Sequence, residues 1–352
     1  MFNLSSITRE NIKCLLPYSS ARDEFSGIAA AFLDANENSL GSPLGKDHKR
    51  YPDPHQLLLK AAIALNKELS AENIFLGNGS DECIDILYRC FCNPGTDNVI
   101  ICPPTYGMYE VSAHVNDIEI RRANLLDNFQ LDIKAINGSV DKNTKIIWVC
   151  SPNNPTGNSM DAGDIKQLIE NFNGLLVIDE AYIDFATQGS FACAFVNYPN
   201  LVVLQTFSKA WGLAALRLGM AFASKEIIAV LNKVKPPYNI SGPTQRLALK
   251  ALHEKPQFET NVLVIKGLRT ILAKKLEELP VIEKMYPSDA NFLLARITKA
   301  SEVYNYLLGK GIVVRNWSNI VLCDSCLRIT VGNQDENELL IAALMNYSNQ
   351  FS

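Results

Sequence analysis

Two charged side chains stand beyond apolar runs of the sequence, and a third follows soon after them. Asp179 closes the run Leu175–Ile178, Lys209 follows the run Leu201–Leu204 with Ser208 before it, and Arg217 comes a little later. Lys209 by itself would be a surface lysine in a loop. An amine beside a buried strand, with a carboxylate at the end of a second one, is costly unless it is paired or bound in a Schiff base. The three residues therefore predict a site at the ends of neighbouring strands.

Each of these groups suits one part of pyridoxal phosphate. The Asp179 carboxylate would face the pyridinium nitrogen, the Lys209 amine would bind the aldehyde, and the Arg217 guanidinium would bind the phosphate. The edge of a sheet where parallel strands end is also where open α/β folds place ligands. Pyridoxal 5'-phosphate is therefore the expected cofactor.

The elements that must position these groups alternate between strand and helix. This alternation predicts an α/β fold, a mainly parallel sheet sandwiched by helices. The expected strands are Ile74–Leu76, Val99–Cys102, Lys145–Cys150, Leu175–Ile178, Leu201–Leu204 and Leu218–Ala223. The expected helices run from a cap at Asp53 to about Leu69, from Cys83 to Cys92, from Tyr106 to Val115 and from Asp161 to Phe172.

A smaller α+β domain is expected after Lys235-Pro236-Pro237. Its predicted helices are Pro243–His253, Gln257–Leu279, Ser301–Leu308 and one that starts at Asp335, where Glu338 completes a capping-box pattern. Its predicted strands are Val281–Met285, Asn291–Arg296, Gly311–Arg315 and Leu327–Val331. We expect residues 1–30 to form an N-terminal arm and part of the small domain, 31–240 the large cofactor-binding domain, and 241–352 the small domain.

A glycine-bearing turn, Gly77-Asn78-Gly79-Ser80-Asp81, opens the helix expected at Cys83. Backbone N–H groups at such a helix start can bind an anion. Many helices begin with Ser or Asp caps and bind nothing, so this turn alone does not distinguish an anion-binding site from an ordinary helix cap.

Composition excludes several classes of protein. The chain has 352 residues and a net charge of −4, so it lacks the basic excess of a nucleic-acid binder. No apolar run is long enough to span a membrane, and the start of the chain does not resemble a secretory signal. Nine cysteines without an export signal are typical of free thiols in the cytoplasm. Cys323 and Cys326 form a single CxxC, best interpreted as a tight turn, and the scattered histidines predict no metal site.

Four motifs in order carry a resemblance to a known family. They are Ser151-Pro152-Asn153-Asn154-Pro155-Thr156-Gly157, Asp179-Glu180-Ala181-Tyr182, Ser208-Lys209 and Arg217-Leu218-Gly219. The set resembles the fold-type I pyridoxal-phosphate aminotransferases over nearly the whole chain. Further stretches resemble the histidinol-phosphate aminotransferases among them, namely Tyr18, Leu33–Asn38, Arg50–Pro54, Arg315 and Leu327–Gly332.

The resemblance implies a role for each cofactor-site residue. Lys209 would hold the cofactor and move a proton, and Asp179 would keep the ring nitrogen protonated. Asn154 and Tyr182 would hydrogen-bond the ring's 3-oxygen, and Tyr106 would stack on its face. The phosphate would be bound by Gly79, Ser80, Asp81, Ser208 and Arg217, with Tyr51 reaching it from the other subunit of a homodimer. Lys209, Asp179 and Tyr182 are then the expected catalytic residues.

The resemblance implies a substrate set as well. Arg328 would bind the anionic end of both substrates, assisted by Arg315, Asn36 and Tyr18. The reaction would convert L-histidinol phosphate and 2-oxoglutarate to imidazole-acetol phosphate and L-glutamate by a ping-pong route, as part of histidine biosynthesis. The alternatives are an aromatic amino acid aminotransferase or a threonine-phosphate decarboxylase on the same fold, and a binding protein without cofactor. Ala215 departs from the family, which usually has glycine there.

Overall fold

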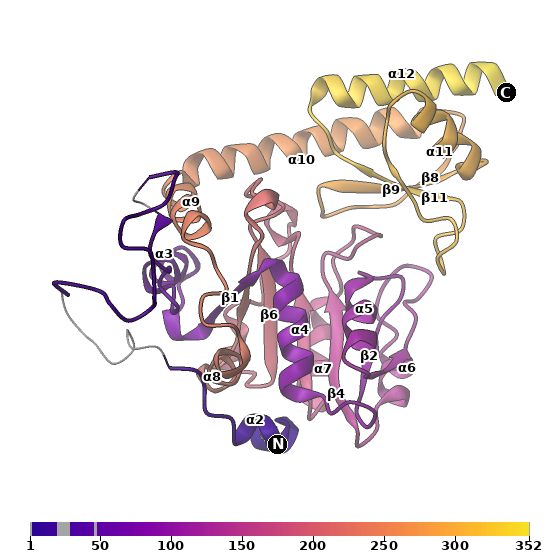
Figure 1. The fold of residues 1–352 in the computed structure, drawn as a ribbon. Coiled ribbons are helices and arrows are strands. Elements are labelled where there is room, and N and C mark those ends of the chain that lie inside the picture. Colours follow the sequence, from indigo (N-terminus) through magenta and orange to yellow (C-terminus); the bar gives the residue numbers. More distant parts are fainter. Residues whose placement is uncertain (1, 20–28, 46–47, 352) are drawn as a thin grey trace.

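A seven-stranded sheet forms the centre of the molecule (Figure 1). The structure is a computed structural model that describes residues 2–19, 29–45 and 48–351. The strand order is β1-β7-β6-β5-β4-β2-β3; β7 is antiparallel to both of its neighbours, and the pairs from β6 to β3 are parallel. The strands are β1 (Ile74–Asn78), β2 (Asn98–Ile101), β3 (Glu119–Arg122), β4 (Thr144–Cys150), β5 (Leu175–Asp179), β6 (Leu201–Thr206) and β7 (Leu218–Phe222). The expected mainly parallel sheet is confirmed.

Helices cover both faces of this sheet because its central strands are apolar on both sides. One core lies under α4, α5 and α8, and the other lies under α3, α6, α7 and α9. The helices are α3 (Leu57–Lys67), α4 (Gly79–Phe91), α5 (Met108–Val115), α6 (Ile133–Ser139), α7 (Ala162–Asn171), α8 (Lys225–Val234) and α9 (Gly242–His253). Strand β3 and helices α6 and α8 were not predicted from the sequence. Strand β3 is a polar edge strand, which gives no alternating or continuous apolar signal.

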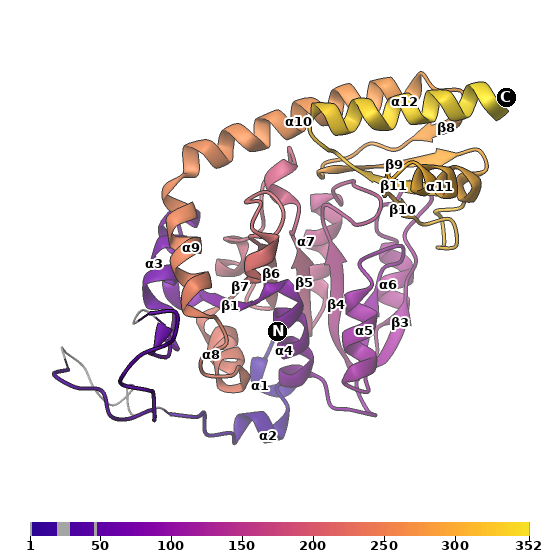
Figure 2. The same ribbon diagram turned by 45° about the horizontal axis from the view of Figure 1, so that its top comes forward.

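A four-stranded antiparallel sheet forms the second unit, in the order β10-β11-β9-β8. The long helix α10 leads to it from the large sheet, and α12 lies alongside α10 (Figures 1 and 2). Its elements are α10 (Lys255–Glu277), β8 (Ile282–Met285), β9 (Phe292–Ile297), α11 (Ala300–Gly309), β10 (Arg315–Asn316), β11 (Cys326–Thr330) and α12 (Gln334–Phe351). The predicted small α+β unit is therefore present.

Several helix starts differ from the prediction: α4 begins at Gly79 and not at Cys83, α5 begins at Met108 and not at Tyr106, and the starts of α3 and α12 depend on their caps. Helix α3 begins at Leu57, because the Asp53 carboxylate accepts the Leu57 N–H at 2.6 Å and Gln56 is left-handed with a φ of 52°. Helix α12 is capped by Asn333, not by Asp335. The Asn333 side chain accepts the Glu336 N–H at 2.9 Å, and the Glu336 carboxylate accepts the Asn333 N–H at 2.8 Å. The capping box thus lies two residues before the predicted one.

The predicted strand Gly311–Arg315 is also reduced. Only Arg315 and Asn316 pair with β11, opposite Arg328 and Leu327. The CxxC is the predicted turn: the Cys326 N–H donates to the Cys323 carbonyl at 3.0 Å, between β10 and β11, and both thiols are free.

The start of the chain packs on the larger unit. Helices α1 (Leu4–Ile7) and α2 (Glu10–Lys13) lie against α4 and α8, where the Arg9 N–H donates to the Cys90 carbonyl at 3.0 Å. No helix in the described ranges combines the length and apolar character needed to cross a membrane.

Candidate active site

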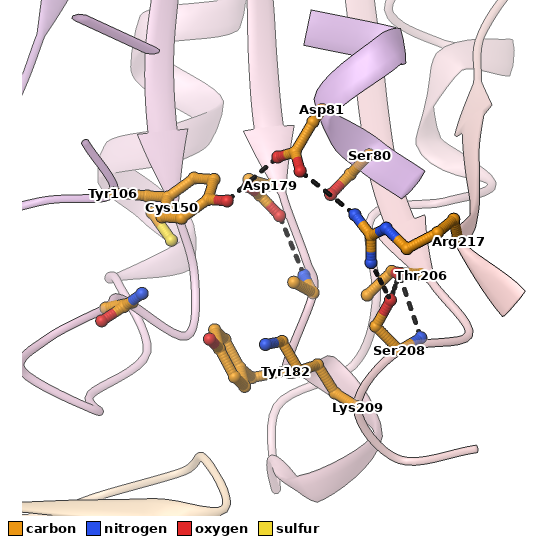
Figure 3. Close-up of a pocket in the computed structure, with 12 residues that line it drawn as sticks. Ser80, Asp81, Tyr106, Cys150, Asp179, Tyr182, Thr206, Ser208, Lys209 and Arg217 are labelled. Carbon is orange, nitrogen blue, oxygen red and sulfur yellow. Dashed lines mark hydrogen bonds and ion pairs between the residues drawn. The ribbon is translucent and has the colours of Figure 1, made fainter. Parts of the chain in front are cut away.

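The carboxyl ends of three parallel strands open into one pocket (Figure 3). Strand β4 ends there at Cys150, β5 at Asp179 and β6 at Thr206. Nine of the residues predicted from the sequence line this pocket. They are Ser80, Asp81, Tyr106, Asn154, Asp179, Tyr182, Ser208, Lys209 and Arg217. The pocket thus forms where the topology brings separate loops to one edge of the sheet.

Asp179 forms the innermost polar group of the pocket and is almost fully buried. Its carboxylate accepts hydrogen bonds from the Tyr109 hydroxyl at 2.8 Å and from the Ala181 N–H at 3.0 Å. Burial raises the pKa of the Asp179 carboxyl, and these two hydrogen bonds act against that rise. A cationic N–H donor in the pocket would restore its ionised form.

Lys209 directs its amine into the pocket beside Tyr182 (Figure 3). The Nζ atom lies 5.4 Å from the centre of the Tyr182 ring. Burial and then the Arg328 guanidinium lower the pKa of the Lys209 amine. A larger share of the amine is therefore neutral, the form that can attack an aldehyde or accept a proton.

The start of α4 forms an anion cup, by which we mean the turn Asn78–Asp81 together with Ser208 and Arg217. Gly79 is left-handed with a φ of 73°, and a Cβ atom there would lie 2.6 Å from Nη2 of Arg217. Arg217 Nη1 donates to the Ser208 hydroxyl at 3.4 Å, and Nη2 lies 3.3 Å from the Asp81 carboxylate. The first N–H groups of a helix have no partners within it, so the cup combines backbone donors with a guanidinium.

Tyr106 closes another side of the pocket. Its hydroxyl donates to the Asp81 carboxylate at 2.9 Å, and burial followed by Asp81 raises its pKa. Tyr106 also lines a second cleft, which extends to Arg315 and Trp317 of the smaller unit. The two hollows therefore adjoin at this tyrosine.

Arg328 reaches the site from the smaller sheet. Its Nη1 donates to Oδ1 of Asn154, and its guanidinium lies 5.2 Å from the Phe292 ring and 5.8 Å from the Trp317 ring. Burial lowers its pKa. In the described ranges, no carboxylate forms an ion pair with Arg328, so this cation is available to an anionic ligand.

Besides Gly79, Arg315 and Arg328, which adjoin the pocket, three further predicted residues lie outside its lining. Tyr51 is half exposed and stacks on Tyr238, with the ring centres 4.5 Å apart. Tyr18 is exposed, and Asn36 adopts a left-handed conformation with a φ of 53°. The segment 29–45 lies beyond α3, away from the sheet (Figures 1 and 2). A single subunit therefore does not bring these side chains to Lys209.

Four residues of the site were not predicted from the sequence. Cys150, Ala181 and Thr206 line the pocket. Tyr109 does not line it but donates a hydrogen bond to the Asp179 carboxylate. Cys150 and Thr206 end apolar runs, so the rule that strand ends form the site could have found them. Tyr109 had no signal of its own. Ala215, at the position where the family usually has glycine, is exposed in the short 3₁₀ turn Ala214–Leu216.

Comparison with known proteins gives the family. The family model described as aminotransferase class I and II matches residues 26–344. The chain belongs to this aminotransferase family. The aminotransferase is 53% identical over 346 residues to the histidinol-phosphate aminotransferase of Cytophaga hutchinsonii, covering 98% of this chain and 99% of the relative.

Other relatives agree with this similarity. The aminotransferase is 52% identical to the histidinol-phosphate aminotransferase of Bacteroides fragilis, over 99% of this chain and 100% of the relative. Among solved structures, the crystal structure of the histidinol-phosphate aminotransferase from Clostridium acetobutylicum superposes with a TM-score of 0.80 and 25% identity. The superposition covers 87% of this chain and 92% of the Clostridium acetobutylicum chain.

Proposed function

We propose that this aminotransferase binds pyridoxal 5'-phosphate and transfers an amino group between L-histidinol phosphate and 2-oxoglutarate, giving imidazole-acetol phosphate and L-glutamate. The observation that carries the proposal is that the Lys209 amine, the buried Asp179 carboxylate and residues of the anion cup line one pocket. About half of the residues are identical to those of relatives named histidinol-phosphate aminotransferase, over nearly the full length of both chains.

The residues present fit this cofactor. The anion cup offers helix-start N–H groups, a hydroxyl and a guanidinium to a phosphate. A Cβ atom at Gly219 would lie 2.2 Å from the Ser80 nitrogen, so β7 approaches the cup as closely as only glycine permits. At the other end, Asp179 is a buried carboxylate that forms no ion pair with any residue the structure describes, which suits a protonated ring nitrogen.

The bound cofactor would supply an aldehyde for the amino group and a ring that takes up negative charge from the substrate's α-carbon. The chain's own residues would do the rest. Lys209 would hold the aldehyde carbon and then move the proton at the α-carbon. Arg217 and Ser208 would fix the phosphate, and Tyr182 and Asn154 would orient the ring through hydrogen bonds.

Arg328 supports the substrate assignment. Both substrates end in an anion, a carboxylate in glutamate and a phosphate in histidinol phosphate. A planar guanidinium binds either one bidentately, and Asn154 and two aromatic rings hold this guanidinium without neutralising it. Arg315, the β10 partner of Arg328, would assist from the adjoining cleft, together with Tyr18 and Asn36.

The proposed active unit is a homodimer. Tyr51 lies outside the pocket of its own subunit, on a loop stiffened by Pro52 and Pro54. We propose that it reaches the partner subunit's cofactor phosphate across a two-fold interface. A cytoplasmic location is also proposed, supported by nine cysteines that are all free thiols.

The test is a comparison of substrates. Purified enzyme loaded with pyridoxal phosphate is assayed with histidinol phosphate, phenylalanine, tyrosine and phosphothreonine. We expect transamination of histidinol phosphate with the highest kcat/KM. A preference for the aromatic amino acids, or carbon dioxide release from phosphothreonine, would assign the chain to another activity on this fold.

A further inference from the structure

Asn239 joins the anion cup to a distant part of the chain. It lies between α8 and α9, and it does not line the pocket. Its Nδ2 amide donates to the Leu76 carbonyl of β1 at 2.9 Å and to Oε2 of Glu82 in α4 at 3.0 Å. One side chain thus bridges the strand and the helix on either side of the turn.

The same two residues hold Asn78, the first residue of the cup. Oε2 of Glu82 accepts the Asn78 N–H at 2.5 Å. The Asn78 side-chain amide donates to the Asn239 carbonyl at 2.6 Å and to Glu82 at 3.3 Å. Asn78 immediately precedes the left-handed Gly79, so these bonds fix the direction in which the helix-start N–H groups point.

The other end of the network lies before α3. Oδ1 of Asn239 accepts the Gln56 side-chain amide at 3.3 Å, and Gln56 is fully buried. Tyr238, the neighbour of Asn239 in sequence, stacks on Tyr51. The turn that carries Tyr51 and the turn that carries the cup are therefore fastened to one short segment.

We propose that Asn239 is a positioning residue for the anion cup, acting with Glu82 on the turn Asn78–Asp81. It contacts neither the cofactor nor the substrate, and it sets the geometry in which the turn binds the phosphate group. This inference rests on the proposed function, because the anion is the phosphate of pyridoxal phosphate.

The physical basis is the geometry of backbone hydrogen bonds. Helix-start N–H groups bind an anion well only when they converge on it, and a hydrogen bond weakens steeply as its angle closes. Removing the Asn239 amide leaves the Glu82 carboxylate with one donor residue, Asn78, and breaks the side-chain link between Glu82 and the Leu76 carbonyl. The loss of one well-formed hydrogen bond to phosphate corresponds to roughly tenfold in affinity.

The experiment measures dissociation constants of the full-length apoenzyme for pyridoxal phosphate and for pyridoxal, which has the same ring and aldehyde without the phosphate. The absorbance of the bound ring reports binding. For Asn239→Ala we expect about tenfold weaker binding of pyridoxal phosphate and less than about twofold change for pyridoxal. Equal weakening of both ligands, or no change in either, would overturn the proposal.

Asn200→Ala is the matched control. The Asn200 amide is also buried and donates to the carbonyls of Ile169, Phe172 and Gly174, but it precedes β6, at the opposite end of the strand from the pocket. Its loss should lower the melting temperature without changing the ratio of the two dissociation constants. If that ratio changes as much as in Asn239→Ala, the effect is one of general stability and the proposal fails.

A second pair of variants tests the role of Glu82. Glu82→Gln keeps a carbonyl that can accept the Asn78 N–H, so we expect it to retain most of the affinity, whereas Glu82→Ala should resemble Asn239→Ala. Equal behaviour of the two Glu82 variants would contradict the network. If the unmodified chain binds pyridoxal as tightly as pyridoxal phosphate, the cup binds no phosphate, and both the proposed function and this inference are wrong.

Discussion

At the scale of single residues, the site is a set of charges held out of water. Asp179 is almost fully buried, Arg328 is half-buried and Lys209 is more exposed, and burial shifts the pKa of each in the direction that favours its neutral form. Charges kept in such surroundings are unfavourable for the empty protein. A ligand that carries a cationic N–H, an aldehyde and an anion would offset all three unfavourable charges, which supports the proposal that these residues serve one function.

Lys209→Ala should abolish transamination and leave cofactor binding in place, because the anion cup and Asp179 remain. We expect the unmodified protein to be yellow, and the variant to bind pyridoxal phosphate without the absorbance of the Schiff base. Stopped-flow absorbance with glutamate measures the lost half-reaction. Lys225→Ala, an exposed lysine paired with Glu72, is the control and should keep full activity. Turnover of the Lys209 variant at the parent rate would refute the assignment.

Arg328→Lys should weaken both half-reactions, because the lysine keeps the charge and loses the planar fork. A lost charge-assisted hydrogen bond costs about 1.5–3 kcal/mol, roughly tenfold to a hundredfold in binding. Single-turnover kinetics with glutamate and with histidinol phosphate give the two effects separately. If glutamate alone is affected, Arg315 or Tyr18 binds the phosphate. If neither changes, Arg328 is structural and the substrate assignment loses its main support.

At the scale of elements, helix α3 buries a lysine on one face and exposes leucine side chains on another. Its buried face includes Lys60, whose side chain lies near Lys235 and Asp53. Burial, and next the charge of Lys235, lower the pKa of Lys60 to about 8. A lysine in this position makes the stability of the helix depend on pH.

Lys60→Met should remove a pH dependence of stability. Between about pH 8 and the ordinary lysine value of 10.5, the unfolded chain holds the Lys60 proton and the folded chain releases it. The free energy of unfolding therefore rises with pH across this window, by up to about 3 kcal/mol. Urea unfolding at several pH values, compared between parent and variant, measures the difference. Parallel curves for the two proteins would show that Lys60 titrates normally.

At the scale of the whole molecule, the exposed face of α3 is apolar. Leu58 is 76% exposed and Leu65 is 83% exposed, one above the other on the helix, and α9 lies alongside (Figure 1). Tyr51 lies on the loop that leads into this helix. This exposed apolar surface lies close to Tyr51, which does not reach the pocket of its own subunit. Both features are expected of a two-fold interface across which Tyr51 reaches the partner's site.

The double variant Leu58→Glu, Leu65→Glu tests the proposed homodimer: it should be monomeric and less active than the parent, because each site would then lack the partner's Tyr51. Sedimentation velocity and activity are measured at the same concentrations. Leu339→Glu, on the exposed side of α12 and 59% exposed, should change neither. A monomer with full activity would contradict the homodimer and the role of Tyr51.

The sequence by itself determined the local pattern of this protein. Continuous apolar runs of strand length predicted the buried parallel strands, and the polar residues that follow them predicted Asp179 and Lys209 as parts of one site. Both signals are local, because a strand buried on two faces must be apolar and its end must carry the functional group. Ordered motifs added Asn154, Tyr182 and Arg217 through their resemblance to a family.

The tertiary structure decided what depends on contacts between distant segments. The hydrogen bonds of Tyr109 to Asp179 and of Arg328 to Asn154 join residues 70 and 174 positions apart, and no local pattern encodes them. The short β10 likewise depends on which residues find a partner on β11. The cap at Asn333 is instead a local contact across three residues, and the prediction missed it because Asp335 and Glu338 have the same spacing as Asn333 and Glu336. Asn239 had no signal in the sequence, because its role arises only where β1, α4 and the turn before α3 meet.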